Sequence, residues 1–219
     1  MTKLAIFDCD GTLVDSQANI CMAMEHAFEE AGLTPPMRHE TRRVVGLSLV
    51  ESMRMLLPEA ADDLHHDLAD KYRAAFWALR SNGLVDEPLY DGMAALLSSL
   101  DENGWMLGVA TGKSDRSLTR CLDHHALRPL FVTLQTADRH PSKPHPSMVY
   151  QALAEAGADA ANAVVIGDTV YDIHMGRAAG TRTVGVNWGY HSVADLREAG
   201  ADYIAESMDE LKVYLENFA

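Results

Sequence analysis

The apolar residues of this chain follow two different spacings, one on each side of residue 86. Between residues 16 and 85 they recur at intervals of three and four, which predicts helices, and no stretch there has the pattern of a strand. After residue 86, short apolar runs alternate with helical stretches. Strands separated by helices form parallel sheets, because a parallel neighbour requires a long crossover connection. The sequence therefore predicts an α/β fold, with a doubly wound, mainly parallel Rossmann-like sheet and an inserted all-helical segment.

Individual elements follow from the same pattern. The chain begins with an apolar strand that starts at Lys3, and Ser16 is expected to cap the helix that comes next. Further strands are expected at 105–110, 130–134, 163–166, 183–186 and 203–204. Helices are expected at 17–31, 41–45, 47–57, 61–79, 92–102, 114–125, 146–156, 170–179, 193–199 and 208–218.

This order of elements predicts two domains. A Rossmann-like core is expected to comprise residues 1–15 and 86–219, and a helical cap is expected to comprise residues 16–85. The turn formers around Asn82 and Pro88 mark the return of the chain to the core. Because the insert directly follows the first strand, we expect the cap to lie over the carboxyl end of that strand, where parallel sheets bind ligands.

Two carboxylates end the first strand. Asp8 and Asp10 are separated by one residue, so the alternation of a strand directs them to one side and Cys9 to the other. Gly11 follows, and a residue without a Cβ lets backbone N–H groups approach an anion. Two acids and a turn glycine are also typical of an ordinary solvated loop. This stretch alone leaves both interpretations open.

Three later stretches, each at the end of a predicted strand or in the loop after it, carry further candidates. Thr111 and Gly112 offer a hydroxyl and an N–H to a phosphate, although the same residues can simply begin the next helix. Lys143 precedes a proline, and taken alone an exposed loop lysine is the more frequent case. Asp168 ends a buried strand and Asp172 lies four residues later, so both carboxylates can face the strand ends. Acids also favour helix N-termini for general electrostatic reasons.

The charge of the chain restricts its partners and suggests a cofactor. A net charge of -14 argues against nucleic acid and against an anionic membrane. Carboxylates about 4 Å apart repel by about 4 kcal/mol per pair at an effective dielectric near 20, so protons or a cation must compensate them. Carboxylate oxygens without convergent histidine or cysteine ligands suit a hard ion such as Mg²⁺. A bound cation would also make an acidic pocket attractive to an anion.

The cysteines and the apolar runs indicate the compartment. Three cysteines, an odd number without metal-like spacing, favour a reducing cytoplasm, and Cys9 is expected to be a small buried apolar residue. No run approaches the ~20 apolar residues of a membrane helix. The first strand begins at Lys3, which leaves no room for a secretory signal. We therefore expect a cytoplasmic protein.

In order along the chain, the segments D-x-D-G-T, T-G, K-P and G-D-x-x-x-D resemble the four motifs of the haloacid dehalogenase (HAD) superfamily, most of whose members are Mg²⁺-dependent phosphatases. A helical cap after the first motif is similar to the C1 cap of subfamily IA of this family. The segments 184–190 and 200–202 look like its phosphoglycolate phosphatase branch. The resemblance spans the whole chain.

The resemblance implies a role for each acid. Asp8 would be the nucleophile that attacks phosphorus and becomes an aspartyl phosphate. Asp10 would be the general acid for the leaving alcohol and then the base for the hydrolytic water. Mg²⁺ would be held by an Asp8 oxygen, the Asp10 backbone carbonyl and Asp168. Asp172 would bind the metal through water or orient Lys143.

The resemblance also implies residues that bind the substrate. Thr111, the Gly112 N–H and Lys143 would hold the phosphoryl oxygens, with Gly11 in the turn beside them. Cap residues are expected to select the substrate. Arg42 and Arg43 are the cap candidates for reaching a substrate carboxylate or a second phosphate, with at most one of them, Arg43, expected in the site, although adjacent arginines on a helix more often form a solvated face.

The interpretation favoured by these residues is a phosphatase for a small phosphorylated metabolite, with Mg²⁺ as its cofactor. A β-phosphoglucomutase-like phosphotransferase, which protects its aspartyl phosphate from water, is the alternative, followed by an inorganic pyrophosphatase. A non-enzymatic binding protein is a third possibility, which the four intact motifs disfavour. Asp10 argues against dehalogenation, because halide leaves without a proton. The sequence decides neither the physiological substrate nor between a monomer and a homodimer.

Overall fold

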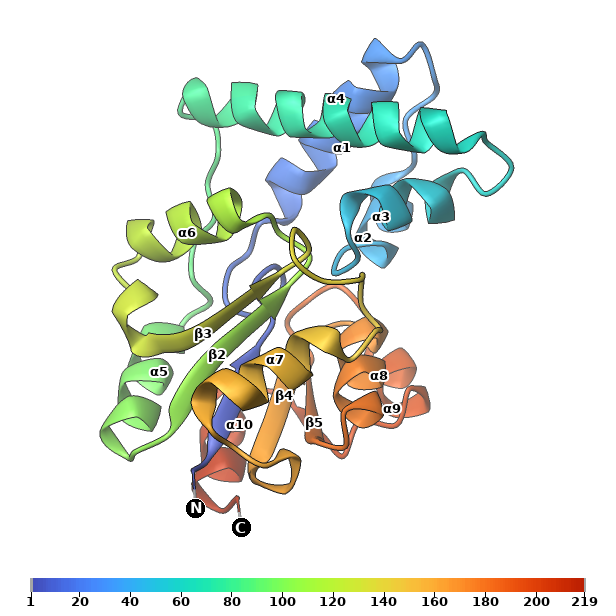
Figure 1. The fold of residues 1–219 in the computed structure, drawn as a ribbon. Coiled ribbons are helices and arrows are strands. Elements are labelled where there is room, and N and C mark those ends of the chain that lie inside the picture. Colours follow the sequence, from blue (N-terminus) through green and yellow to red (C-terminus); the bar gives the residue numbers. More distant parts are fainter. Residues whose placement is uncertain (1, 219) are drawn as a thin grey trace.

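A computed structural model describes residues 2–218 of the chain. Its six strands form one sheet in the order β3-β2-β1-β4-β5-β6, and every neighbouring pair is parallel (Figure 1). The chain starts in the middle of the sheet, builds outwards to β3, returns to β4 and builds outwards again to β6. The predicted α/β fold with a doubly wound parallel sheet is confirmed. In such sheets ligands bind where the strand order reverses, which here is between β1 and β4.

The strands are short, and those in the centre are fully covered by helices. They are β1 (Leu4–Phe7), β2 (Met106–Thr111), β3 (Phe131–Thr136), β4 (Ala163–Gly167), β5 (Arg182–Val186) and β6 (Tyr203–Ala205). All four side chains of β1 are completely buried. Ala5 and Phe7 belong to the apolar cluster on one face of the sheet, and Leu4 and Ile6 to the cluster on the other. A strand buried on both faces explains why the first apolar run has no polar alternation.

Helices from the second part of the chain cover the two faces. The cluster on the first face includes side chains of α5 (Met93–Glu102), α6 (Asp115–His124) and α10 (Met208–Glu216). The cluster on the other face includes α7 (Ser147–Ala156) and α8 (Val170–Ala178). The short helix α9 (Val193–Glu198) packs against β5, and two 3₁₀ turns, η1 (Arg128–Leu130) and η2 (Ala160–Asn162), were not predicted.

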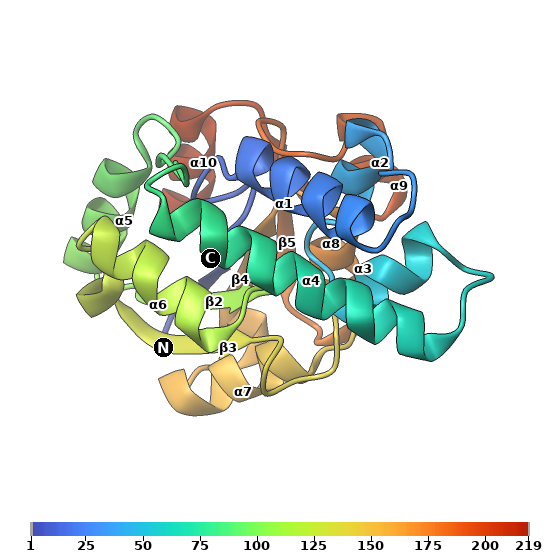
Figure 2. The ribbon, with the colours of Figure 1, turned by 90° about the horizontal axis from the view of Figure 1, so that it is seen from above.

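Four helices near the N-terminus form a separate layer over one end of the sheet (Figures 1 and 2). They are α1 (Gln17–Glu30), α2 (Arg38–Arg43), α3 (Leu49–Leu56) and α4 (Asp62–Ser81). Their buried side chains form an apolar cluster distinct from the two around the sheet. We therefore propose the division expected from the sequence, with a core of residues 1–15 and 86–219 and a cap of residues 16–85.

The predicted bounds of the helices and strands differ from the observed ones by at most three residues. The largest shift concerns α2, which begins at Arg38 instead of Thr41. Glu40 is the reason, because its side chain accepts a hydrogen bond from the backbone N–H of Met37 at 2.8 Å and so satisfies a donor at the start of the helix.

Candidate active site

Three carboxylates and one lysine meet at the point where the strand order reverses. Asp8 directly follows β1, Asp168 directly follows β4, and Asp172 lies in the first turn of α8. One oxygen of each lies within 4.8 Å of the other two. Lys143 reaches them from the loop between β3 and α7, and none of the four residues is more than 1% exposed. We refer to these four residues as the Lys143 cluster.

Lys143 connects two of the acids. Its Nζ lies 2.8 Å from Asp8 Oδ1 and 2.6 Å from Asp172 Oδ1. Burial alone would lower the pKa of this lysine, but the carboxylates of Asp172 and Asp8 raise it above its ordinary value. Lys143 is therefore a fixed positive charge beside Asp8.

Hydrogen bonds from the surrounding loops fix the other two carboxylates. The hydroxyl of Thr12 donates to Asp168 Oδ1 at 2.8 Å, and the backbone N–H of Tyr190 donates to Oδ2 at 2.9 Å. The hydroxyl and the N–H of Thr169 donate to Asp172 Oδ2 at 2.7 and 3.1 Å. Thr12 was not predicted as a site residue, although it lies within the D-x-D-G-T segment.

Two glycines make room for Asp168. Gly11 has a φ of +84°, and a Cβ there would lie 2.3 Å from Asp168 Oδ2. A Cβ at Gly189 would lie 2.2 Å from the Cβ of the same aspartate. Gly11 is thus required both for its left-handed backbone and for the close approach of Asp168.

Asp8 differs from its neighbours because neither of its oxygens accepts a well-aligned hydrogen bond from a described residue. Burial raises its pKa from 3.8 to about 7, opposed by Lys143 and assisted by Asp172 and Asp10. Burial and the charges of Asp8 and Asp172 also raise the pKa of Asp168 well above its ordinary value. Buried carboxylate oxygens that accept no aligned hydrogen bond, in a group whose only possible metal ligands are oxygens, fit a hard divalent cation. The residues present therefore fit a metal ion of this kind.

Asp10 lies in a second charged group. Lys113 Nζ is 2.8 Å from Asp10 Oδ1 and 2.7 Å from Glu87 Oε1, and Arg80 is 2.5 Å from Glu87 Oε2. Burial would raise the pKa of Glu87, but Lys113 and Arg80 hold it below its usual range. We refer to Asp10, Arg80, Glu87 and Lys113 as the Lys113 cluster. It connects β1 and the β2–α6 loop to the C-terminal part of α4.

Ser16 belongs to this region rather than to a helix cap. It stands at the N-cap position of α1, but its side chain makes no cap hydrogen bond. Its hydroxyl donates to Asp10 Oδ1 instead. Glu87 and Arg80 were not predicted as neighbours of Asp10, because they are far from it in sequence and belong to none of the four motifs. Lys113 directly follows the T-G segment, so its position near the site could be expected from that motif.

Thr111 and Gly112 lie at the carboxyl end of β2. Thr111 is buried, and its Oγ1 accepts a hydrogen bond from the N–H of Lys113 at 3.2 Å. Gly112 faces the cap, since a Cβ there would lie 2.5 Å from the carbonyl oxygen of Leu47. The absence of a side chain at Gly112 therefore lets the loop between α2 and α3 approach the core.

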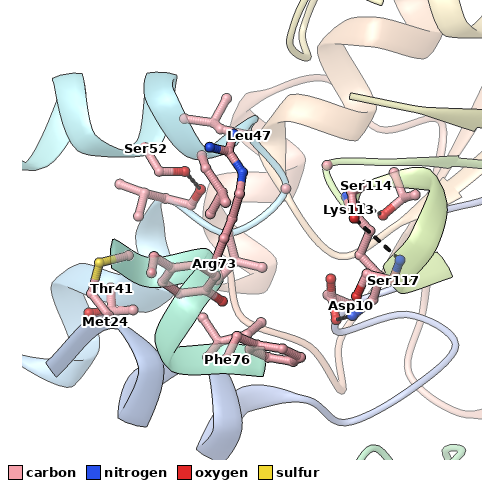
Figure 3. Close-up of a pocket in the computed structure, with 18 of the residues that line it drawn as sticks. Asp10, Met24, Thr41, Leu47, Ser52, Arg73, Phe76, Lys113, Ser114 and Ser117 are labelled. Carbon is pink, nitrogen blue, oxygen red and sulfur yellow. Dashed lines mark hydrogen bonds and ion pairs between the residues drawn. The ribbon is translucent and has the colours of Figure 1, made fainter. Parts of the chain in front are cut away.

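A cavity of about 260 Å³ lies between the cap and the core, and both Asp8 and Asp10 line it. Figure 3 shows its two sides, with Leu47, Arg73 and Phe76 on the cap side and Asp10 and Lys113 on the core side. Most of the cap residues that line it are apolar, namely Ile20, Met24, Val44, Val45, Leu47, Leu49, Tyr72, Phe76 and Trp77. The core side of the cavity is therefore polar, and the cap side is mostly apolar.

Arg43 does not line this cavity. Its side chain is exposed, and its backbone carbonyl accepts a hydrogen bond from the hydroxyl of Tyr171 at 2.9 Å. The short helix α2 ends at Arg43, which places the side chain on the outer surface of the cap. Other arginines line the cavity instead, from α4 and from α6, namely Arg73, Arg80, Arg116 and Arg120. The adjacent arginines Arg42 and Arg43 are therefore not among the basic residues that line this cavity.

Comparisons with known proteins agree with this geometry. Residues 5–186 match the family model described as haloacid dehalogenase-like hydrolase. The chain belongs to this family. It is thus a hydrolase, and the family resemblance expected from its motifs is confirmed.

Several individual proteins of known name are similar over nearly the whole chain. The probable phosphatase IndB of Dickeya dadantii is 33% identical, over 96% of this chain and 92% of IndB. The pyrophosphatase PpaX of Bacillus pumilus is 31% identical, over 94% and 93% of the two chains, and a phosphoglycolate phosphatase of Nitrosococcus oceani is 29% identical, over 99% and 98%. Among solved structures, a predicted phosphatase from Clostridium acetobutylicum superimposes with a TM-score of 0.87 at 28% identity, covering 99% of each chain.

A separate observation concerns membranes. Within residues 2–218, no helix combines the length and the apolar character needed to cross a bilayer.

Proposed function

We propose that this hydrolase is a Mg²⁺-dependent phosphatase that cleaves a small phosphomonoester through an aspartyl phosphate on Asp8, in the manner of a phosphoglycolate phosphatase. The observation that carries the proposal is the environment of Asp8. It lines the cavity, has a lysine 2.8 Å away, and has two buried oxygens without aligned hydrogen bonds. A carboxylate that is paired with a lysine but accepts no aligned hydrogen bond is available to attack an electrophile.

The proposed reaction has two halves, and both use Asp10. In the first, an Asp8 oxygen attacks phosphorus, the bond from phosphorus to the ester oxygen breaks, and Asp10 gives its proton to the leaving alcohol. In the second, Asp10 takes a proton from water as the water attacks phosphorus, and the bond between phosphorus and Asp8 breaks. Inorganic phosphate is released, and both aspartates return to their starting states. Lys113 and Ser16 hold Asp10 at the edge of the cavity for these steps.

Four other residues would bind the phosphoryl group. Thr111 and the N–H of Gly112 lie at the end of β2, Gly11 forms the turn after β1, and Lys143 supplies a positive charge on the side of Asp172. Charge on the phosphoryl oxygens would thereby be neutralised where it develops in the transition state.

Mg²⁺ would be held by Asp8, Asp168 and Asp172, together with the backbone carbonyl of Asp10. When bound, it would neutralise phosphoryl oxygens and orient the phosphate for in-line attack. The charge balance of the Lys143 cluster supports this assignment, because it contains three carboxylates and one cation.

The lining of the cavity favours an organic substrate. The apolar side chains on the cap side of the cavity can cover the carbon skeleton of a phosphorylated metabolite, which pyrophosphate lacks. A β-phosphoglucomutase-like phosphotransferase stays the alternative, because it would use the same residues for the first half of the reaction.

The proposal is tested by phosphate release from a panel that contains phosphoglycolate, hexose phosphates, nucleotides and pyrophosphate, with Mg²⁺ or with a chelator. We expect metal-dependent turnover that Asp8→Asn abolishes and that Asp15→Asn leaves unchanged. Asp15 is an exposed neighbour in sequence that lies outside both clusters, and it serves as the matched control. Transfer from a sugar bisphosphate without net phosphate release would instead establish the phosphotransferase. Full activity in Asp8→Asn would refute the proposed nucleophile.

A further inference from the structure

An unusual group of positive charges lies at one end of the cavity. Arg116 and Arg120 project from consecutive turns of α6 towards Trp77 of α4, with their guanidinium carbons 3.9 and 4.4 Å from the centre of its ring. All three side chains line the cavity, and Arg80 lines it beside them. The indole thus holds two cations of the core against the cap.

Neither of these two arginines has an acidic partner among residues 2–218. Arg80 does, because Glu87 neutralises it. In a chain with 32 acidic and 18 basic residues, two adjacent guanidinium groups without carboxylates are unexpected. The pKa of Arg120 lies below its ordinary value because of desolvation and of the nearby positive charges of Arg116 and Arg80.

The way these arginines are held leaves them ready to bind an anion. Stacking on an aromatic ring uses the face of a guanidinium group and leaves its N–H edges free. Those edges match the geometry of a carboxylate or a phosphate, to which arginine donates two parallel hydrogen bonds. A salt bridge would have occupied the same edges.

The aromatic side chain of Phe76 lies between Arg80 and the catalytic end of the cavity. The ring of Phe76 lies 5.9 Å from Lys113 Nζ, which contacts Asp10, and 5.5 Å from the guanidinium carbon of Arg80. Figure 3 shows Phe76 extending from α4 towards the side that carries Asp10 and Lys113. A substrate that reaches from Asp8 to Arg116 would therefore pass over an apolar surface.

We propose that Arg116 and Arg120 bind a second oxyanion of the substrate, a carboxylate or a phosphate, at the end opposite to the phosphoryl group that is cleaved. The substrate class is then a phosphomonoester with an apolar body and a distal acidic group. This inference deepens the proposed function and rests on it.

The test uses matched ligands that differ only in the distal group. Alkyl phosphates of increasing chain length are prepared with a terminal carboxylate, a terminal phosphate or a terminal primary amide. For the wild type we expect kcat/KM to be roughly tenfold or more higher for an acidic terminus than for the amide, since each charge-assisted hydrogen bond lost has about that effect. Comparing the carboxylate and phosphate series identifies which oxyanion is preferred.

The variants assign that preference to the two arginines. Arg116→Gln/Arg120→Gln should bring the ratio between acid and amide close to one, mainly through KM, while hydrolysis of p-nitrophenyl phosphate is retained. Arg116→Lys/Arg120→Lys keeps the charges and should keep part of the preference. Arg182→Gln, at the amino end of β5 and outside the cavity, should keep all of it. A structural role for the arginines would instead lower the activity towards all compounds equally.

Two outcomes would overturn the inference: a wild-type ratio near one, or a ratio that survives in the double glutamine variant. Absence of turnover of every compound, including p-nitrophenyl phosphate with Mg²⁺, would refute the proposed function instead. In that case the affinities of an ω-carboxyalkyl phosphonate and of its amide are measured by calorimetry, which gives the ratio between acid and amide without catalysis. A ratio near one for the wild type, or a ratio that survives in the double glutamine variant, would again overturn the inference.

Discussion

The two buried lysines of this site have similar contacts but different charge balances. Lys143 lies among three carboxylates, and within residues 2–218 no second basic side chain forms an ion pair with them. Lys113 contacts two carboxylates, and Arg80 supplies a second positive charge to that group. With every side chain ionised, the Lys113 cluster is neutral, whereas the Lys143 cluster carries an excess of negative charge that protons or a bound cation must compensate. The comparison supports the proposed metal site at the Lys143 cluster and not at the Lys113 cluster, even though both contain buried aspartates.

The largest expected effect comes from removing the lysine of the Lys143 cluster. Lys143→Met leaves three buried carboxylates without any positive side chain. We expect the free energy of unfolding in a chelator to fall by about 3–5 kcal/mol, and phosphatase activity to be lost. Mg²⁺ should restore more stability to this variant than it adds to the wild type, because it replaces the missing charge. Urea unfolding with chelator and with saturating Mg²⁺ measures both quantities.

Lys113→Met is the matched variant in the balanced cluster. It also removes a buried lysine from two carboxylates, but Arg80 still pairs with Glu87. We expect a smaller loss of stability, and Mg²⁺ should not restore it, because no oxygen-only group of three acids is involved. Equal rescue of the two lysine variants by Mg²⁺ would show that the two clusters do not differ in the way proposed.

The difference between the clusters also explains what the sequence could predict. The Lys143 cluster comes from short motifs at strand ends, and parallel strands bring their carboxyl ends together regardless of their separation in sequence. Asp8, Asp168 and Asp172 could therefore be placed near one another from the pattern, whereas Lys143 was placed with them by the family resemblance. The same pattern predicted the sheet and the helical insert, because hydrophobic periodicity determines which faces are buried.

The Lys113 cluster and the arginine pair could not be predicted in this way. Glu87 and Arg80 lie where the cap returns to the core, and their contacts depend on how the cap is oriented. Arg116 is directed by the indole of Trp77, a contact between two helices that are not neighbours in sequence. Arg43 was selected as a positive charge in the cap, but helix periodicity cannot say which side of a short helix faces a cavity formed by two domains.

The next effect in size is a dependence of the free energy of unfolding on pH, which arises from Asp8 in the Lys143 cluster. Without metal, the pKa of Asp8 is about 7 in the folded protein and 3.8 is its ordinary value. Between these values the folded state holds a proton that the unfolded state has lost, so this residue makes stability decrease as pH rises, by up to about 1.4 kcal/mol per pH unit. Asp8→Asn removes this dependence, and the difference between the two proteins in urea unfolding from pH 4 to pH 8 isolates it.

The same titration affects the metal. Because a metal must displace the proton from Asp8, the apparent affinity for Mg²⁺ should increase as pH rises towards 7 and level off above it. Calorimetric titration of the wild type across this range tests the expectation. A wild-type stability that runs parallel to that of Asp8→Asn, together with a metal affinity independent of pH, would show that Asp8 is ionised throughout.

The smallest effect distinguishes the two roles that the sequence and the structure give to Ser16. A serine that caps a helix contributes about 1 kcal/mol, and Ser207 is such a cap, since its hydroxyl accepts a hydrogen bond from the N–H of Glu210 at 3.2 Å. Ser16 makes no such bond and donates to Asp10 instead.

Ser207→Ala should therefore lower stability by about 1 kcal/mol and leave kcat unchanged. Ser16→Ala should lower kcat by roughly tenfold, because Asp10 loses a charge-assisted hydrogen bond that orients it, with little change in the stability of α1. Thermal unfolding and steady-state kinetics of the two variants, measured side by side, separate the cases. If Ser16→Ala instead loses stability and keeps its kcat, then Ser16 acts as the helix cap that the sequence predicted, and its hydrogen bond to Asp10 does not contribute to catalysis.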